Sequence, residues 1–380
     1  MKPAVLFTAC ALALLPLSTA SAQQAPQRSE LGQNAALQYW QAFNFLPHND
    51  ADLSKLAEWR TLPLDEKSES LVGNLRFLHA GAQLKQCDWG VDLSAGPYTL
   101  LPFLNRSRPL TQQACLRVRF DIAQKKYGDA VEHGCDALVA ARHVTNPPVM
   151  ISYLVCFANE RDATDALCTG LNSFDPDSLT RLITRLDNLP PMPTLSDSLK
   201  LERAMTVEWS IKKVRSAGPN PNWHDTLGFL GIREGKPDLN AVDQLVKEAG
   251  GTPDSIAAKI EALLPFYQEA AKLDSSHLTQ AEFNKQAQQL TSKYASNPFS
   301  SPILPQLEGI HNAVIAAQTR MTLLRAAIAV TQNGPDAVKQ FTDPSDHQPI
   351  TYQPKSNGFE LTSKLIYHNQ PLTLTVGQLK

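Results

Sequence analysis

The chain has 380 residues, 43% of them hydrophobic and 19% charged, which is typical of a folded protein. Its formal net charge is −2. Acidic and basic residues are interspersed along the chain, and lysines and arginines form no cluster. This pattern argues against a nucleic-acid partner. The length exceeds what one hydrophobic core usually serves, so we expect two domains or one extended helical array.

Residues 1–22 have the pattern of a secretory signal peptide. Lys2 provides a positive charge, residues 4–17 are mostly apolar, and Ala20-Ser21-Ala22 is a small-residue cleavage site. The apolar segment is too short for a transmembrane helix, and no second apolar stretch approaches the ~20 residues that such a helix needs. The sequence therefore predicts a periplasmic or secreted protein that is cleaved after Ala22 and keeps no transmembrane segment.

Helical periodicity continues through most of the remaining chain. Apolar residues lie on one stripe across 71–82. Two amphipathic segments, 115–123 and 131–143, flank Tyr127-Gly128-Asp129-Ala130, and a third runs from Val149 towards Thr169. This pattern resembles a tetratricopeptide-like hairpin. We therefore expect antiparallel helical hairpins here.

Three further helices have recognisable N-terminal signals. Asp175 precedes Pro176, which gives an N-cap followed by proline at the first helical position. Thr252-Pro253 has the same arrangement, and Thr279–Glu282 matches a capping box. These signals predict helix starts at 176, 253 and 280.

The segment 305–333 has apolar residues at alternating steps of three and four. This spacing allows a coiled-coil seam, but further apolar residues widen the face, which favours a central core helix. Beyond it, residues 335–380 alternate between apolar and polar, and Asn357-Gly358 is typical of a hairpin turn. We expect a small antiparallel sheet docked on the long helix, because so small a sheet is not stable alone.

Together these patterns predict a mainly α fold, an array of antiparallel helical hairpins with a small C-terminal antiparallel β element. The expected organisation is a signal peptide at 1–22, a helical-hairpin region at 23–189, a second helical region at 194–334 that ends in the long core helix, and a β tail at 335–380. The proline-rich stretch 190–193 separates the two helical regions.

Five cysteines follow the signal peptide: Cys87, Cys115, Cys135, Cys156 and Cys168. An exported protein can keep disulfides, and no pair has the Cys-x-x-Cys spacing of a metal or redox motif. If the turn between the helices of Cys135 and Cys156 lies near Thr145-Asn146, both cysteines are about ten residues from it and reach the same height. We therefore predict a Cys135–Cys156 disulfide and, more weakly, Cys87–Cys115. The alternative is that the cysteines are small buried apolar residues.

The tail contains three short motifs: Asp343-Pro344, Pro349-Ile350-x-Tyr352 and Gly358-Phe359-x-Leu361-x-Ser363. With the exported start, Cys87-Asp88-Trp89 and Leu201-Glu202-Arg203, they resemble motifs of uncharacterised helical proteins exported by bacteria such as planctomycetes and acidobacteria. The tail is also similar, more distantly, to pseudopilin-like C-terminal sheets. The resemblance implies an exported helical protein and no activity. Since the chain lacks an N-terminal pilin helix, we do not expect a pilus subunit.

The motifs of common enzyme classes are absent from the sequence. There is no His-Glu-x-x-His zinc motif, no Gly-x-Ser-x-Gly nucleophile elbow and no glycine-rich phosphate loop. Ser210-Ile211-Lys212-Lys213 matches Ser-x-x-Lys, a pattern expected by chance in such a chain. We therefore expect neither a metal site nor a cofactor.

Two long connections, 88–105 and 218–240, contain most candidate functional residues. Trp223-His224-Asp225 places an aromatic ring, an imidazole and a carboxylate side by side, so His224 and Asp225 are candidate catalytic residues. Trp89, Trp223 and Arg233 are candidate binding residues. Packing of the connections onto the helices explains the aromatic rings more simply.

Glu202 is a further catalytic candidate, because a pair with Glu208 would resemble the two carboxylates of a glycosidase. Two residues six apart on one helix project about 120° from each other, however. Lys200 and Arg203 nearby indicate a solvated charged face instead.

Two functions follow from these expectations. The first is an exported helical scaffold or binding protein of the bacterial envelope, which binds a protein or peptide in grooves between hairpins. The second is an exported hydrolase whose site lies between the two helical halves, near 223–233 or Glu202. The lack of a catalytic motif favours the first, whereas a deep cavity with convergent polar groups would favour the second.

Overall fold

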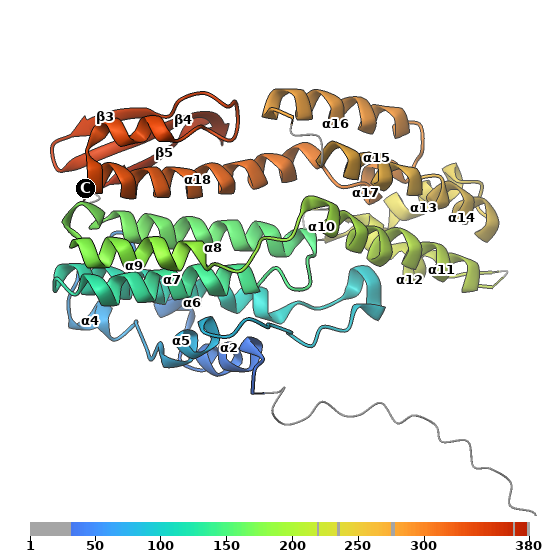
Figure 1. The fold of residues 1–380 in the computed structure, drawn as a ribbon. Coiled ribbons are helices and arrows are strands. Elements are labelled where there is room, and N and C mark those ends of the chain that lie inside the picture. Colours follow the sequence, from blue (N-terminus) through green and yellow to red (C-terminus); the bar gives the residue numbers. More distant parts are fainter. Residues whose placement is uncertain (1–31, 219, 234–235, 275–277, 368, 378–380) are drawn as a thin grey trace, which may run out of the picture. The chain divides into compact units, whose positions relative to one another are not determined.

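The fold is mainly α-helical with a small antiparallel sheet at its C-terminal end, as the sequence predicts (Figure 1). The computed structural model describes residues 32–218, 220–233, 236–274, 278–367 and 369–377. The predicted signal peptide at 1–22 lies outside these residues. The buried apolar side chains form two clusters.

The first cluster is built on three long helices that pack against one another, α6 (Pro102–Ala123), α7 (Tyr127–His143) and α8 (Met150–Cys168) (Figure 1). Smaller elements surround them: α2 (Ala35–Phe43), α3 (Asp50–Ala57), α4 (Glu66–Glu69), α5 (Arg76–Ala82), η1 (Leu93–Tyr98), η2 (Leu171–Ser173) and α9 (Pro176–Asp187). The predicted start of α9 is confirmed, since the Asp175 carboxylate accepts a hydrogen bond from the Ser178 N–H at 2.8 Å.

The hairpin expected around Tyr127–Ala130 is present, but its turn lies earlier in the chain. Helix α6 ends at Ala123, and Tyr127–Ala130 form the first turn of α7. Lys125, with a φ of 59°, lies in the connection. His133 on α7 reaches back to Asp121 on α6 at 2.8 Å, as in an antiparallel pair.

The second cluster contains shorter elements: α10 (Leu195–Glu202), the π-helix η3 (Arg203–Glu208), α11 (Trp209–Ser216), α12 (Trp223–Leu227), η4 (Gly228–Gly231), β1 (Ile232–Arg233), β2 (Lys236–Pro237), α13 (Leu239–Glu248), α14 (Pro253–Glu261), α15 (Leu264–Asp274), α16 (Gln280–Tyr294) and α17 (Ser300–Ile303). The predicted helix starts at Thr252-Pro253 and Thr279–Glu282 are both confirmed as capping boxes. The described residues of the connection at 218–240 therefore form a series of short elements and not an open loop.

The long helix α18 (Leu307–Asn333) belongs to both clusters. Its Leu307 side chain packs in the second cluster, whereas Leu323, Leu324 and Ile328 are buried in the first. In Figure 1 it runs between α8 on one side and α16 and the sheet on the other. The helix is thus a central core helix, and it ends at Gly334, whose φ is 87°.

The β tail follows the 3₁₀ segment η5 (Pro335–Gln340) and consists of β3 (Thr351–Lys355), β4 (Gly358–Tyr367) and β5 (Gln370–Val376), in the order β3-β4-β5. Lys355 pairs with Gly358 across the predicted hairpin turn. The sheet packs on α18 through a buried apolar face: Ile350, Phe359, Leu361, Leu365, Leu372, Leu374 and Val376. The predicted docking on the long helix is therefore confirmed.

One helical stretch among the described residues, Ser300–Asn333, is long and apolar enough to cross a membrane by length and composition, with a mean hydropathy of 1.3 over its most apolar window. By length and composition it therefore approaches the size that the sequence did not lead us to expect after the signal peptide. Of that window, 56% is buried inside the structure. A core helix that packs on α8 and on the sheet needs this apolar surface.

The predicted disulfides are not formed, because all five cysteines of the described chain are free and buried. The thiol of Cys156 contacts the sulfur of Met192 at 3.8 Å. Burial raises the pKa of the Cys87 and Cys135 thiols to about 12. The alternative interpretation, that the cysteines are small core residues, describes them correctly.

The predicted Cys135–Cys156 disulfide is wrong because it assumed a different relative position of α7 and α8 along their axes. Gly134 lies against Leu167, and Arg142 bonds Glu160, so Cys135 faces about residue 166 of α8. That position is ten residues, or about 15 Å, from Cys156 along the helix. Residues 144–149 connect the end of α7 to the start of α8. Because this connection is not symmetric about its midpoint, the midpoint does not determine which residues of the two helices face each other.

Candidate functional site

The candidate residues at 223–225 do not converge on one site. His224 Nε2 lies 2.8 Å from the Asp243 carboxylate on α13, whereas the Asp225 carboxylate accepts a hydrogen bond from Asn222 at 2.7 Å. The Trp223 ring packs on the second cluster. Arg233 lies in β1, and its side chain is outside the described part of the chain. These contacts cap α12 and hold it on α13.

Glu202 ends α10, where a π-helical turn begins. Its carboxylate accepts a hydrogen bond from Thr206 at 3.2 Å, and burial raises its pKa. Glu208 pairs with Arg203 at 2.8 Å on the wider π turn, so the two carboxylates have separate partners. The glycosidase alternative therefore has no hydrogen bond shared between Glu202 and Glu208 to support it.

Trp89 is buried in an aromatic group beside α2 and α6. Its ring stacks on Phe103 with centroids 4.4 Å apart and also contacts Tyr39 and Phe43. The indole N–H donates to the His143 carbonyl at 3.0 Å. Trp89 is therefore a core residue, which agrees with the alternative that the aromatic rings of the connections pack onto the helices.

The two long connections meet in a second aromatic group. Tyr98, Trp209 and Phe229 contact one another edge to face, each pair at 5.9 Å. Gly96 lies so close to the Trp209 ring that a Cβ there would come within 2.5 Å of it. These contacts hold η1 against the start of α11 and against η4.

A cavity of about 680 Å³ lies between α8 and α18, where the two apolar clusters meet. We call it the α8–α18 cavity. Its volume is in the range of small-molecule sites, about 300–1,000 Å³. Apolar and thioether side chains make up most of its wall, among them Tyr153, Phe157, Met192, Phe283, Val314 and Met321. Its ionisable side chains are Arg142, Glu160, His311, Arg325 and His347.

Arg142 and Glu160 form a buried ion pair in this wall. Arg142 Nε donates to the Glu160 carboxylate at 2.9 Å, and its Nη1 donates to the Pro190 carbonyl at 2.6 Å. The Glu160 side chain is only 5% exposed, and burial raises its pKa although Arg142 opposes this. The second terminal nitrogen of Arg142, Nη2, has no hydrogen-bond partner among the described residues.

His311 is a second buried polar side chain in the wall of the α8–α18 cavity. Its ring stacks on Phe283 with centroids 3.6 Å apart and planes 8° from parallel. The residue is 8% exposed, and neither ring nitrogen has a hydrogen-bond partner in the described structure. Burial lowers its pKa to about 4, so the imidazole is neutral at pH 7 and offers one donor and one acceptor.

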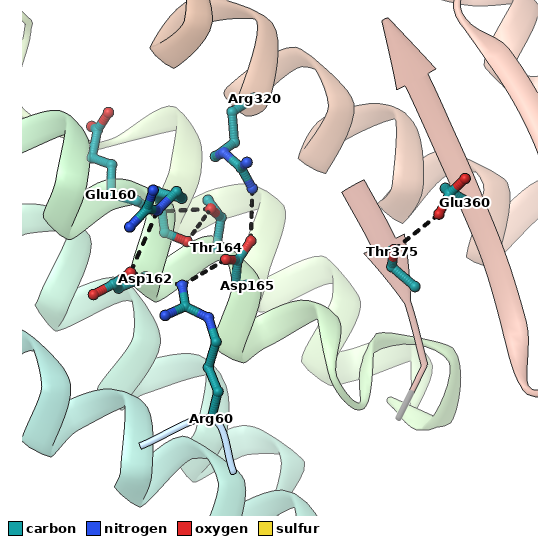
Figure 2. Close-up of polar contacts among 9 residues, drawn as sticks. Arg60, Glu160, Asp162, Thr164, Asp165, Arg320, Glu360 and Thr375 are labelled. Atoms are coloured by element: carbon teal, nitrogen blue, oxygen red, sulfur yellow. Dashed lines mark hydrogen bonds and ion pairs between the residues drawn. The ribbon is translucent and has the colours of Figure 1, made fainter. Parts of the chain in front are cut away.

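Further acidic residues of α8 bind arginines from other elements. Figure 2 shows Asp165 between Arg60 and Arg320, at 2.7 Å and 2.6 Å. Arg60 also bonds Asp162 at 2.7 Å. This network ties α8 to α18 and to the segment that follows α3, and each carboxylate in it has a cation. It is a structural network and offers no open site.

A second cavity of about 410 Å³ lies on the sheet side of the same helix pair. Phe157, Glu160, Ala317 and Met321 line both cavities, so these side chains form the partition between them. Beyond the partition the wall includes Arg320 and residues 370–373 of β5.

One group of possible metal ligands among the described residues includes two carboxylates that already pair with an arginine. His79, Glu132 and Asp136 place their ligand atoms within 4.8 Å of one another. Arg185 bonds Asp136 at 2.7 Å and Glu132 at 3.2 Å, so an arginine already forms ion pairs with both carboxylates. A metal ion would have to displace it.

No protein-family model matches the chain, and comparisons with curated proteins and with solved structures find no significant similarity. The resemblance of the tail motifs to exported helical proteins therefore stays a prediction. Function has to be inferred from the site itself.

The α8–α18 cavity contains none of the residues selected from the sequence. The sequence contains no distinct signal for the cavity, because Glu160 lies in the polar run Asn159-Glu160-Arg161-Asp162 of α8 and His311 is one of several polar residues of α18. The alternative hydrolase site was expected near 223–233 or Glu202, and none of these residues lines the cavity.

Proposed function

We propose that this chain is an exported helical binding protein of the bacterial envelope and that it binds a small, largely apolar molecule in the α8–α18 cavity. The cavity supports this through its volume and its aromatic and thioether wall. The sequence led us to expect a protein or peptide partner. We favour a small molecule, because peptide sites are usually elongated grooves or sheet edges.

The observation that carries the proposal is the unpartnered imidazole of His311 in the cavity wall. A buried polar atom without a partner costs about 1–3 kcal/mol, so native structures satisfy nearly all of them. A polar group of a bound molecule would provide the missing hydrogen bonds. The stacking on Phe283 holds the ring in place for this contact.

The cavity also has the convergent polar groups expected of a hydrolase. Hydrolysis through a covalent intermediate needs a nucleophile within hydrogen-bond reach of a base. Here Glu160 is held by Arg142, and His311 bonds no nucleophile or carboxylate in the described chain. This arrangement supports binding over hydrolysis.

Fluorescence of the neutral probe N-phenyl-1-naphthylamine tests the proposal. The wild-type protein should enhance its emission, and Val314→Trp should weaken binding by tenfold or more, because the larger indole takes up space between α8 and α18. Ile366→Trp is the matched control, since Ile366 is 56% exposed on β4 and lines neither cavity. Equal binding by the wild type and Val314→Trp would contradict the proposal.

Export is a separate part of the proposal and rests on residues 1–22. When the full chain is produced in a bacterium, we expect the envelope fraction to contain protein that begins at Gln23. N-terminal sequencing of that fraction measures this directly. A mature protein that retains residues 1–22 would refute cleavage after Ala22.

A further inference from the structure

We infer that the bound molecule is an elongated amphipathic monoanion, with its anionic group near Arg142 and Arg325 and an uncharged hydrogen-bonding group near His311. This inference rests on the proposed function and specifies its ligand. It follows from the charges at one end of the cavity, the apolar wall between the ends, and the neutral imidazole at the other end.

Positive charge dominates the ionisable lining of the α8–α18 cavity. Arg142 and Arg325 contribute two cations, Glu160 contributes the one carboxylate of this lining, and burial keeps His311 neutral at pH 7. The Asp187 carboxylate that bonds Arg325 at 2.6 Å is 57% exposed and does not line the cavity. An anionic group is therefore the charged group that this lining favours.

Both arginines bond the chain at or just after the end of α9. Arg325 bonds Asp187, the last residue of α9, and Arg142 bonds the carbonyl of Pro190 just beyond it. Nη2 of Arg142 has no partner there among the described residues. A carboxylate between the two guanidinium groups would complete their hydrogen bonds.

His311 lies at the opposite end of the same helix wall. It is fourteen residues before Arg325 on α18, which corresponds to about 21 Å along the helix axis. Between them the wall includes Val314 and Met321 from α18 and Phe157 from α8. A molecule that reaches both ends is therefore elongated, with an apolar body. Flexible thioether side chains such as Met321 adapt to such a body.

Three twelve-carbon probes separate the parts of this inference, measured by displacement of N-phenyl-1-naphthylamine from the wild-type protein. Dodecanoate should bind about threefold to tenfold more tightly than dodecanol, because only dodecanoate has the charge for the arginines. 12-Hydroxydodecanoate should bind about fivefold more tightly than dodecanoate, because its hydroxyl can bond His311.

Two variants assign each preference to its residue. Arg325→Gln should remove most of the preference for dodecanoate over dodecanol, and His311→Phe should remove the preference for the hydroxylated chain. Arg215→Gln is the matched control, because Arg215 forms a similar exposed pair with Glu261 at 2.8 Å and lines neither cavity. It should leave both preferences unchanged.

Equal affinity for dodecanoate and dodecanol, or preferences that persist in both variants, would overturn this inference. Binding of N-phenyl-1-naphthylamine that depends on Val314 would still support the proposed function in that case. Failure of the wild-type protein to bind the fluorescent probe and the three chains would overturn both.

Discussion

Replacing Arg142 with methionine should lower the free energy of unfolding by about 3–5 kcal/mol at pH 7. The substitution leaves the Glu160 carboxylate, 5% exposed, without the guanidinium that bonds it at 2.9 Å. It also removes the hydrogen bond to the Pro190 carbonyl that holds the linker after α9. Equilibrium denaturation in urea, followed by circular dichroism, measures the loss.

The loss should depend on pH in a direction set by Glu160. Burial already raises the pKa of this carboxyl, and removal of Arg142 takes away the group that opposes the increase. An acid with a higher pKa in the folded than in the unfolded chain takes up its proton first in the folded state, so its cost falls as the pH falls. The difference between the wild type and Arg142→Met should therefore shrink between pH 7 and about pH 4.5, close to the ordinary glutamate pKa. A constant difference would show that another contact is responsible.

Two further variants separate the buried charge from lost packing. The double variant Arg142→Met/Glu160→Gln should recover most of the stability, because it removes both charges together. Arg215→Met is the surface control, since Arg215 and Glu261 are 55% and 48% exposed. It should cost less than about 1 kcal/mol.

Features decided by neighbouring residues were predictable from the sequence. The capping box at Thr279–Glu282 uses contacts three residues apart, at 2.9 Å and 3.4 Å. Asp175 and Pro176 start α9 in the same local way, and the hairpin at Asn357-Gly358 needs only its own turn residues. Each signal lies within one turn of the chain.

Features that depend on distant residues were not predictable. The stripe at 71–82 suggested one helix, but Gly73 adopts a φ of 65° and α5 starts only at Arg76, although Leu71 and Leu75 are buried as expected. The α8–α18 cavity combines Arg142, Glu160 and His311 from three helices. Periodicity shows which face of each helix is buried, but it does not show which helices meet.

Helix α18 explains why the two halves of the chain are not separate units. Buried apolar residues between 195 and 307 form the second cluster, and α18 begins in it at Leu307. The later residues of α18 are buried in the first cluster, together with the apolar face of the sheet. The cavity lies along this shared helix, so its shape depends on packing in both clusters. A change in the sheet should therefore affect the whole chain.

Leu361→Ala in β4 should lower the free energy of unfolding by about 2–5 kcal/mol, within a single cooperative transition. Leu361 is 0% exposed, pairs with Leu374 in the sheet and packs in the cluster that includes α18. Truncation leaves a void under a helix that belongs to both clusters, so both should unfold together. The matched control is Ile366→Ala on the same strand, 56% exposed, which should cost less than about 1 kcal/mol. Two separate melting transitions for Leu361→Ala, or equal costs for the two variants, would show that the sheet does not brace α18.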